Sequence, residues 1–149
     1  MRKENDPYSE FGYYIHRVVM LLDKRGEELF RTELGISLRQ FLLLRLIEAD
    51  AKHAPSQQLI TDRLGIAKSA VSRHIDIARE KGWIEVSTSE TSRRQNSLSL
   101  TKEGKALLTK AKALIEQSEN EGFGDVPEAD VEATLRVLQS LYKKLLASY

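Results

Sequence analysis

Residues 57–82 read QQLITDRLGIAKSAVSRHIDIAREKG, and the rest of the architecture can be worked out from them. Gly65 divides this stretch, because glycine can end a helix in the left-handed conformation. In the second half Val71, Ile75 and Ala78 recur at i, i+4 and i+7, which is one stripe of a helix. Two short helices around a tight glycine turn predict a helix-turn-helix, whose second helix has the dimensions to enter the major groove of DNA.

Two further helices are expected before this stretch. Apolar side chains recur at three- and four-residue spacing between residues 11 and 30, which predicts a long first helix. Gly26 lies within it and costs about 1 kcal/mol relative to alanine. Ser37 then suits the N-cap of a second helix, whose run FLLLRLI at residues 41–47 is apolar on nearly all sides. That second helix is therefore expected at the centre of the core.

A β-hairpin is expected directly after the helix-turn-helix. Residues 83–87 alternate apolar and polar side chains, and residues 96–100 do so again, as half-buried strands do. Residues 88–94 lie between them, and their polar composition with Arg93 and Arg94 predicts an exposed hairpin loop. Such a hairpin has the form of a wing.

Two more helices complete the chain. Thr101 suits the N-cap of a fifth helix, and the segment from Gly122 to Pro127 ends it. A last helix follows, with an apolar stripe at Val131, Leu135, Leu138, Tyr142 and Leu145. The predicted fold class is mainly α with one small β-hairpin.

The outward face of the second helix of the helix-turn-helix is small, polar and cationic. At 100° per residue, Ser69, Ser72, Arg73 and Asp76 lie opposite the apolar stripe. Serine hydroxyls reach bases or phosphates, arginine can form two hydrogen bonds to guanine, and Lys68 at the helix start suits a phosphate. Asp76 would repel DNA unless it orients Arg73 or accepts from cytosine, and the first role is favoured. The plain alternative for the whole face is a solvated surface.

Several short motifs together resemble the MarR (multiple antibiotic resistance regulator) family over about residues 37–108. The motifs are LGIAKSAVSR at 64–73, EKGWI at 80–84, RR at 93–94 and LTKEG at 100–104. The resemblance implies a winged helix-turn-helix homodimer on a pseudo-palindromic operator. The recognition helix, residues 67–81, would lie in the major groove and the wing in the adjacent minor groove.

The chain is expected to form one domain over residues 1–149, and the same resemblance assigns a role to each of its parts. Residues 37–105 would form the DNA-binding lobe, and residues 1–36 and 106–149 would be N- and C-terminal dimerisation helices. The expected DNA-binding residues are Lys68, Ser69, Ser72, Arg73, Arg93 and Arg94, with the last drawn into the narrow minor groove. The expected dimerisation residues are Phe11, Ile15, Val18, Val131, Leu135, Leu138, Tyr142 and Leu145.

Three positions depart from the family pattern. Ser92 stands where an aspartate usually orients the wing arginine, so either Glu90 takes that role or the wing is looser. Ala67 stands where a serine usually caps the recognition helix, which costs about 0.5–2 kcal/mol unless another group caps it. His74 stands where leucine is common, and a packed, hydrogen-bonded histidine is favoured over a DNA contact or a metal ligand. Trp83 is expected to pack at the start of the wing rather than to stack on a base.

Composition excludes several classes of protein. The 149 residues suit one domain and contain no cysteine, which excludes disulfides, thiolate zinc sites and a thiol-oxidation switch. Residues 1–10 lack the apolar core of a secretion signal, and no run approaches the roughly 18 apolar residues of a membrane span. A cytoplasmic protein without a membrane contact is expected. Because no phosphate loop, nucleophile elbow or paired metal motif is present, no enzyme, metal or cofactor is expected.

The distribution of charge distinguishes between the two functions that remain, DNA binding and protein docking. The chain has 23 basic and 22 acidic side chains, but residues 55–105 hold nine basic and six acidic ones. A winged helix can also bind another protein, yet the outward faces here carry Lys68, Arg73 and the two wing arginines and no large apolar side chain. Sequence-specific binding of double-stranded DNA is therefore predicted over protein docking. The resemblance implies a repressor that is released by a small aromatic or amphipathic effector.

Overall fold

The computed structural model describes residues 6–89 and 92–148, with only the backbone described at residue 89 and residues 92–95. The chain divides into two compact units, Met1–Leu114 and Ile115–Tyr149. The first unit holds α1 (Pro7–Leu34), α2 (Leu38–Ala49), the 3₁₀ helix η1 (Ala51–His53), α3 (Gln57–Leu64), α4 (Lys68–Glu80), β1 (Ile84–Ser89), β2 (Ser92–Leu100) and the first part of α5 (Lys102–Phe123). The rest of α5 and α6 (Glu128–Leu146) form the second. The predicted class, mainly α with one hairpin, is confirmed.

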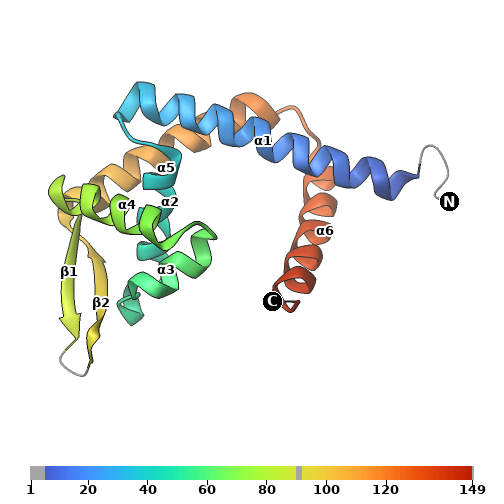
Figure 1. Cartoon of the computed structure of the whole chain (residues 1–149). Helices are drawn as coiled ribbons and strands as arrows, with labels where there is room; N and C mark the ends of the chain where they lie inside the picture. Colours follow the sequence, from blue (N-terminus) through green and yellow to red (C-terminus); the bar gives the residue numbers. More distant parts are fainter. Residues whose placement is uncertain (1–5, 90–91, 149) are drawn as a thin grey trace. The chain divides into compact units, whose positions relative to one another are not determined.

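Helix α1 is unbroken. Asp6 caps it by accepting a hydrogen bond from the Tyr8 amide at 3.2 Å, and Gly35 ends it with φ at 65°. Gly26 lies inside the helix without interrupting it. The N-terminal half of α1 extends beyond α2, α3 and α4 (Figure 1), so its apolar side chains stay exposed.

Helix α2 lies at the centre of the first unit, as its apolar sequence predicts. Its capping box is complete: Ser37 Oγ accepts from the Gln40 amide at 3.1 Å, and Gln40 Oε1 accepts from the Ser37 amide at 2.9 Å. Phe41, Leu43, Leu44 and Ile47 are buried. The helix contacts α1, α3, α4 and β2, so it is the scaffold on which the other elements are placed.

Helices α3 and α4 form the predicted helix-turn-helix. Ser56 Oγ accepts from the Leu59 amide at 3.2 Å and caps α3, and Gly65 ends α3 with φ at 63°. Only glycine adopts that left-handed conformation without strain, so the turn into α4 depends on it. Val71, Ile75 and Ala78 are buried, as predicted, and α4 starts at Ala67 without a side-chain cap.

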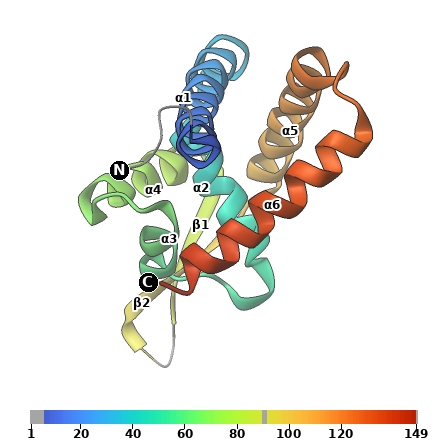
Figure 2. The same ribbon diagram turned by 90° about the vertical axis from the view of Figure 1, so that its right-hand side faces the viewer.

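The hairpin is longer than its apolar alternation predicts. Strands β1 and β2 pair antiparallel from Ile84 opposite Leu100 onward, with an irregularity between Thr88 and Ser89. The prediction of a loop at residues 88–94 is therefore wrong over most of its length, because strand pairing uses backbone hydrogen bonds that polar side chains also permit. Figure 1 shows the strands running away from α4, and in Figure 2 the far end of the hairpin lies below α3.

The base of the hairpin is joined tightly to α5. Thr101 Oγ1 accepts from the Gly104 amide at 3.0 Å, which confirms the predicted cap, and donates to the Gly82 carbonyl oxygen at 2.5 Å. A Cβ on Gly104 would lie 2.0 Å from the Trp83 carbonyl oxygen, so only glycine fits there. Trp83 is half-buried at this junction.

The second unit presents an apolar face. Its side chains at Val131, Leu135, Leu138, Tyr142 and Leu145 are all exposed. A groove of about 340 Å³ between the end of α5 and α6 is lined mainly by Phe123, Val126, Val131, Leu135 and Leu138. Among the described residues, no helix combines the length and the apolar character that crossing a membrane requires.

Candidate nucleic-acid interface

Helix α4 presents a polar, cationic face away from the core. Lys68, Ser69 and Arg73 are exposed on the side opposite the buried stripe. No carboxylate among the described residues forms an ion pair with Arg73, so its charge and its hydrogen-bond donors are available. This is the arrangement that phosphate or guanine binding requires.

Ser72 lies at the edge of this face, toward α3. It is half-buried, and its Oγ accepts a hydrogen bond from Gln57 Nε2 at 2.6 Å. The hydroxyl hydrogen of Ser72 is still available as a donor. Gln57 was not expected in the site, because the contact spans the turn between α3 and α4. The only sequence signal for it is a long polar side chain directly after the Ser56 cap.

Asp76 does not orient Arg73, so that expectation is wrong. Its Oδ1 accepts from the Arg79 guanidinium at 3.2 Å. Side chains of an α-helix lean toward its N-terminus, so Arg79 leans over Asp76 whereas Arg73 leans away from it. The charge of Asp76 is therefore balanced within α4, and Arg73 has no acidic partner among the described residues.

His74 lies on the flank of α4, beside Arg73. It is half-buried, as expected, but its Nδ1 is buried without a hydrogen-bond partner among the described residues, so the hydrogen-bonded part of the expectation is wrong for this atom. Burial lowers the pKa of His74 below its ordinary value, and the positive charges of Arg73 and Arg39 lower it further. The lowered pKa favours the neutral form of the imidazole.

Arg93 and Arg94 lie on β2, and their side chains are outside the part of the chain that the structure describes. Glu90, the expected substitute for the wing aspartate, is outside it as well. The hairpin itself is placed next to the recognition helix, because β1 contacts α4 and follows it after a short turn.

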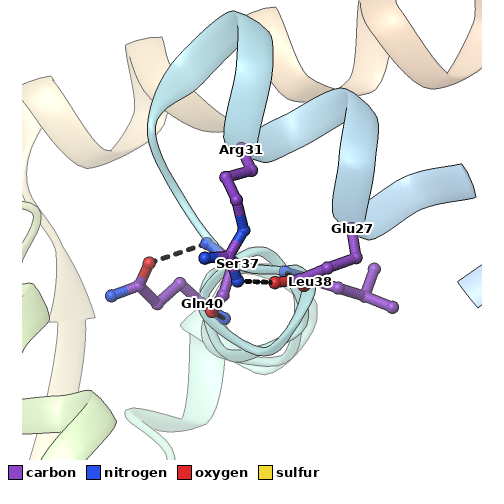
Figure 3. A network of polar contacts seen from close by, with 5 residues as sticks. All are labelled: Glu27, Arg31, Ser37, Leu38 and Gln40. Carbon is purple, nitrogen blue, oxygen red and sulfur yellow. Dashed lines mark hydrogen bonds and ion pairs between the residues drawn. The ribbon is translucent and has the colours of Figure 1, made fainter. Parts of the chain in front are cut away.

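A polar network joins α1 to the start of α2 (Figure 3). Glu27 Oε2 accepts from the Leu38 amide at 2.7 Å, and the same carboxylate pairs with Arg31. The hydrogen bond from Leu38 holds the pKa of Glu27 below its ordinary value, and Arg31 adds to this effect. Sequence reasoning missed Glu27, because Leu38 lies eleven positions further along the chain and beyond the end of α1.

The expected dimerisation side chains are mostly uncovered in the single chain. Phe11 and Val18 of α1 are exposed, and Ile15 is half-buried. The five apolar side chains of α6 are exposed too. Large exposed apolar faces of this kind mark surfaces that associate.

Comparison with known proteins identifies relatives along most of the chain. The sequence profile described as the MarR family matches residues 34–95. The chain is 30% identical over 136 residues to the HTH-type transcriptional regulator PecS of Dickeya dadantii (strain 3937), covering 90% of this chain and 80% of PecS. It is 29% identical over 110 residues to the transcriptional repressor MprA of Escherichia coli (strain K12), covering 72% of this chain and 61% of MprA.

Solved structures share the fold. A MarR/EmrR family transcriptional regulator from Acinetobacter sp. ADP1 superposes with a TM-score of 0.77 at 23% identity, covering 94% of this chain and 97% of that one. The structure of a MepR–DNA complex from S. aureus superposes with a TM-score of 0.73 at 16% identity, covering 91% and 96%. Both have the winged helix-turn-helix architecture to which α1–α6 correspond.

Proposed function

The chain belongs to the MarR family of transcriptional regulators, and we propose that it binds a specific double-stranded DNA operator as a homodimer and represses transcription from it. The observation that carries this proposal is the exposed cationic face of α4, with Lys68 and Ser69 at its start and, one turn later, Arg73, which pairs with no carboxylate in the described part of the chain. The DNA-binding residues would be these three with Ser72, Arg93 and Arg94.

The electrostatics of α4 favour DNA over a protein partner. Asp76 is neutralised by Arg79, so the remaining charges on the outward face are those of Lys68 and Arg73 and, at the C-terminal end of the helix, that of Glu80. Among the described residues, no large apolar side chain between Leu22 and Phe123 is exposed. A protein-docking face would need such side chains at its centre.

Dimerisation would supply a second recognition helix for the second half-site of the operator. The exposed apolar faces of residues 1–36 and 106–149 would be covered by a second copy, which places two recognition helices on one side of the assembly. Repression is supported by MprA, which is a transcriptional repressor. Release of the protein from its operator by a small effector would involve the same dimer. Because the protein would act on DNA, we propose a cytoplasmic location.

Selection of bound duplexes from a random pool tests this function. At a fixed ionic strength of about 0.15 M, we expect enrichment of a pseudo-palindrome whose half-sites lie about one helical turn apart. The variant Lys68→Ala/Arg73→Ala serves as the control and should enrich no motif. If the wild type also enriches none, and its weak binding is equal on all sequences, the proposal is wrong.

A further inference from the structure

Gln57 is the first residue of α3, and its side chain contacts the recognition helix across the turn at Gly65. Its Nε2 donates to Ser72 Oγ at 2.6 Å, and both residues are half-buried. Because the two residues belong to different helices, this bond sets the orientation of the hydroxyl relative to α3 as well as to α4. A residue of α3 therefore takes part in the site on α4.

The backbone that carries Gln57 is anchored on both sides. Its carbonyl oxygen accepts from Thr61 Oγ1 at 2.9 Å, and the preceding residue, Ser56, caps α3 through its own hydroxyl. Before that cap, the carbonyl oxygen of buried Pro55 accepts from the Leu98 amide of β2 at 2.9 Å. With the backbone fixed, only side-chain dihedral angles remain to be ordered, which lowers the entropy cost of holding the amide on one partner.

The amide of Gln57 limits what the Ser72 hydroxyl can do. A serine hydroxyl has one hydrogen to donate and two lone pairs that accept, and the amide occupies one lone pair. Hydroxyls inside helices often donate to the carbonyl oxygen four residues earlier, as Thr61 and Thr109 do. Ser72 forms no such bond to the Lys68 carbonyl oxygen in the described part of the chain. Its hydrogen is therefore left for a partner outside the protein.

The direction of this hydrogen decides which base edges the hydroxyl suits. In the major groove guanine presents N7 and O6 as acceptors and adenine presents N7, whereas cytosine presents an amino group that donates. A serine hydroxyl that turns freely suits either kind of edge. A hydroxyl that already accepts from an amide is a stronger donor, because hydrogen bonds in a chain polarise one another. The arrangement at Ser72 therefore favours a purine acceptor over the cytosine amino group.

We propose that Gln57 is a positioning residue for base recognition, and that its amide makes the Ser72 hydroxyl a donor that selects purine over cytosine at one position of each half-site. The proposal rests on the function proposed above, in which α4 enters the major groove. Gln57 acts through Ser72 and not on the base itself. Its contribution is therefore to the ratio of the affinities for two bases, and not to the affinity for DNA in general.

The measured quantity is the ratio of the Kd values for cytosine and for purine at the base that Ser72 contacts. Duplex selection with the wild type supplies the operator, and Ser72→Ala identifies the base as the one whose preference is lost. Titrations at one ionic strength then compare operators that differ only at that base pair. A change that weakens binding equally on all sequences cancels in this ratio, so general repulsion and partial unfolding do not affect it.

Two substitutions of Gln57 test the direction of the bond. Gln57→Met keeps the length of the side chain and removes the donor, so the preference for purine should fall about three- to tenfold. Gln57→Glu replaces the donor with a carboxylate that accepts the Ser72 hydrogen, so the preference should turn toward cytosine. Gln58→Met is the matched control, because the exposed Gln58 amide donates to Asp62 at 2.8 Å, and it should keep the wild-type ratio.

A double-mutant cycle separates positioning from a direct contact with DNA. In the Ser72→Ala background, Gln57→Met should change operator affinity less than about twofold, because the group through which Gln57 acts is gone. NMR of the DNA-free protein tests the bond itself. Ser72→Ala should shift the side-chain amide resonances of Gln57, whereas Ser69→Ala, which alters an exposed serine of the same helix, should leave them unchanged.

Three results would overturn the proposal. A purine preference that survives Gln57→Glu would show that Gln57 does not set the direction of the hydroxyl. Equal weakening by Gln57→Met with and without the Ser72 hydroxyl would show that Gln57 contacts DNA on its own. Unchanged preference at every position in Ser72→Ala would show that Ser72 contacts no base. In all three cases the wild type still selects an operator and the proposed function stands, whereas a wild type that selects none would remove both proposals.

Discussion

Of the two arginines of α4, Arg73 is the one that has no acidic partner among the described residues. Arg79 pairs with Asp76 on the same helix, and Lys68 lies at the helix start, where we expect it to contact a phosphate rather than a base. An unpaired guanidinium on the exposed face can form two hydrogen bonds to guanine without first breaking an ion pair. Base recognition is therefore expected to depend on this residue.

Arg73→Ala should cost about 1–3 kcal/mol of operator affinity and relax the preference at one base pair in each half-site. Duplex selection followed by titration of the consensus and of single-base variants measures both effects. Arg79→Ala is the matched control and should keep the preference. Equal weakening on all sequences would show that Arg73 contacts phosphate only.

Glu27 is the residue through which α1 is attached to the start of α2. Its lowered pKa means that the folded state holds the carboxylate in its charged form more strongly than the unfolded chain does. The stabilisation is therefore present above the unfolded glutamate pKa of about 4.3 and is lost as pH falls through the lower folded value.

Glu27→Gln should lower the free energy of unfolding by about 1 kcal/mol at neutral pH, because it removes the charge from a hydrogen bond and from an ion pair. The difference from wild type should shrink as the pH drops below about 4.3. Urea unfolding across this range measures it. Glu28→Gln, an exposed neighbour, should differ little from wild type at any pH, and a gap for Glu27→Gln that persists in acid would contradict the assignment.

Among the elements, the recognition helix starts without a cap although its neighbours are capped. Ser37 and Ser56 bond the first turns of α2 and α3, whereas Ala67 offers no side-chain acceptor to α4. The backbone of Ala67, with φ at −56° and ψ at 138°, is extended as an N-cap requires. The first turn, which holds Lys68 and Ser69, is therefore held less firmly than it would be with a serine.

Ala67→Ser should stabilise the chain by about 1 kcal/mol. For a protein of this size that corresponds to a rise in Tm of roughly 2–4 °C, which thermal unfolding followed by circular dichroism detects. Ala113→Ser places the same residue at an exposed position inside α5, where it should destabilise by a few tenths of a kcal/mol. Equal changes for the two variants would rule out a capping effect.

At the scale of the whole molecule, apolar surface remains uncovered on both units. Leu135 is 51% exposed and lies with Leu138 on the stripe of α6, and Phe11 and Val18 are exposed on α1. A chain with this much exposed apolar surface gains by association, since burying it releases roughly 25 cal/mol per Å² before the costs of binding.

Leu135→Glu should convert the proposed homodimer into a monomer, because a carboxylate without a partner would be buried at the interface. Sedimentation velocity measures the change, and operator affinity should fall with it because one half-site is lost. Ser140→Glu lies on the opposite side of α6 and should remain dimeric. A dimer that survives Leu135→Glu would exclude the α6 stripe from the interface.

Local signals were enough to predict most of the elements. The caps at Ser37, Ser56 and Thr101 and the glycine at Gly65 act within about four residues, so helix starts and ends follow from the order of side chains. The buried stripe of α4 follows in the same way from helical periodicity. The hairpin loop was misplaced because backbone pairing extends beyond the apolar alternation that marks a strand.

Contacts between elements could be identified only from the tertiary structure. Gln57 meets Ser72 across a turn, and Glu27 meets the Leu38 amide across a helix end. These pairs depend on the angles at which helices pack, and the angles come from the burial of the core as a whole. Amino-acid order therefore specified the helix-turn-helix, its cationic face and, through helical spacing, the pairing of Arg79 with Asp76, whereas packing decided which side chains of separate elements meet.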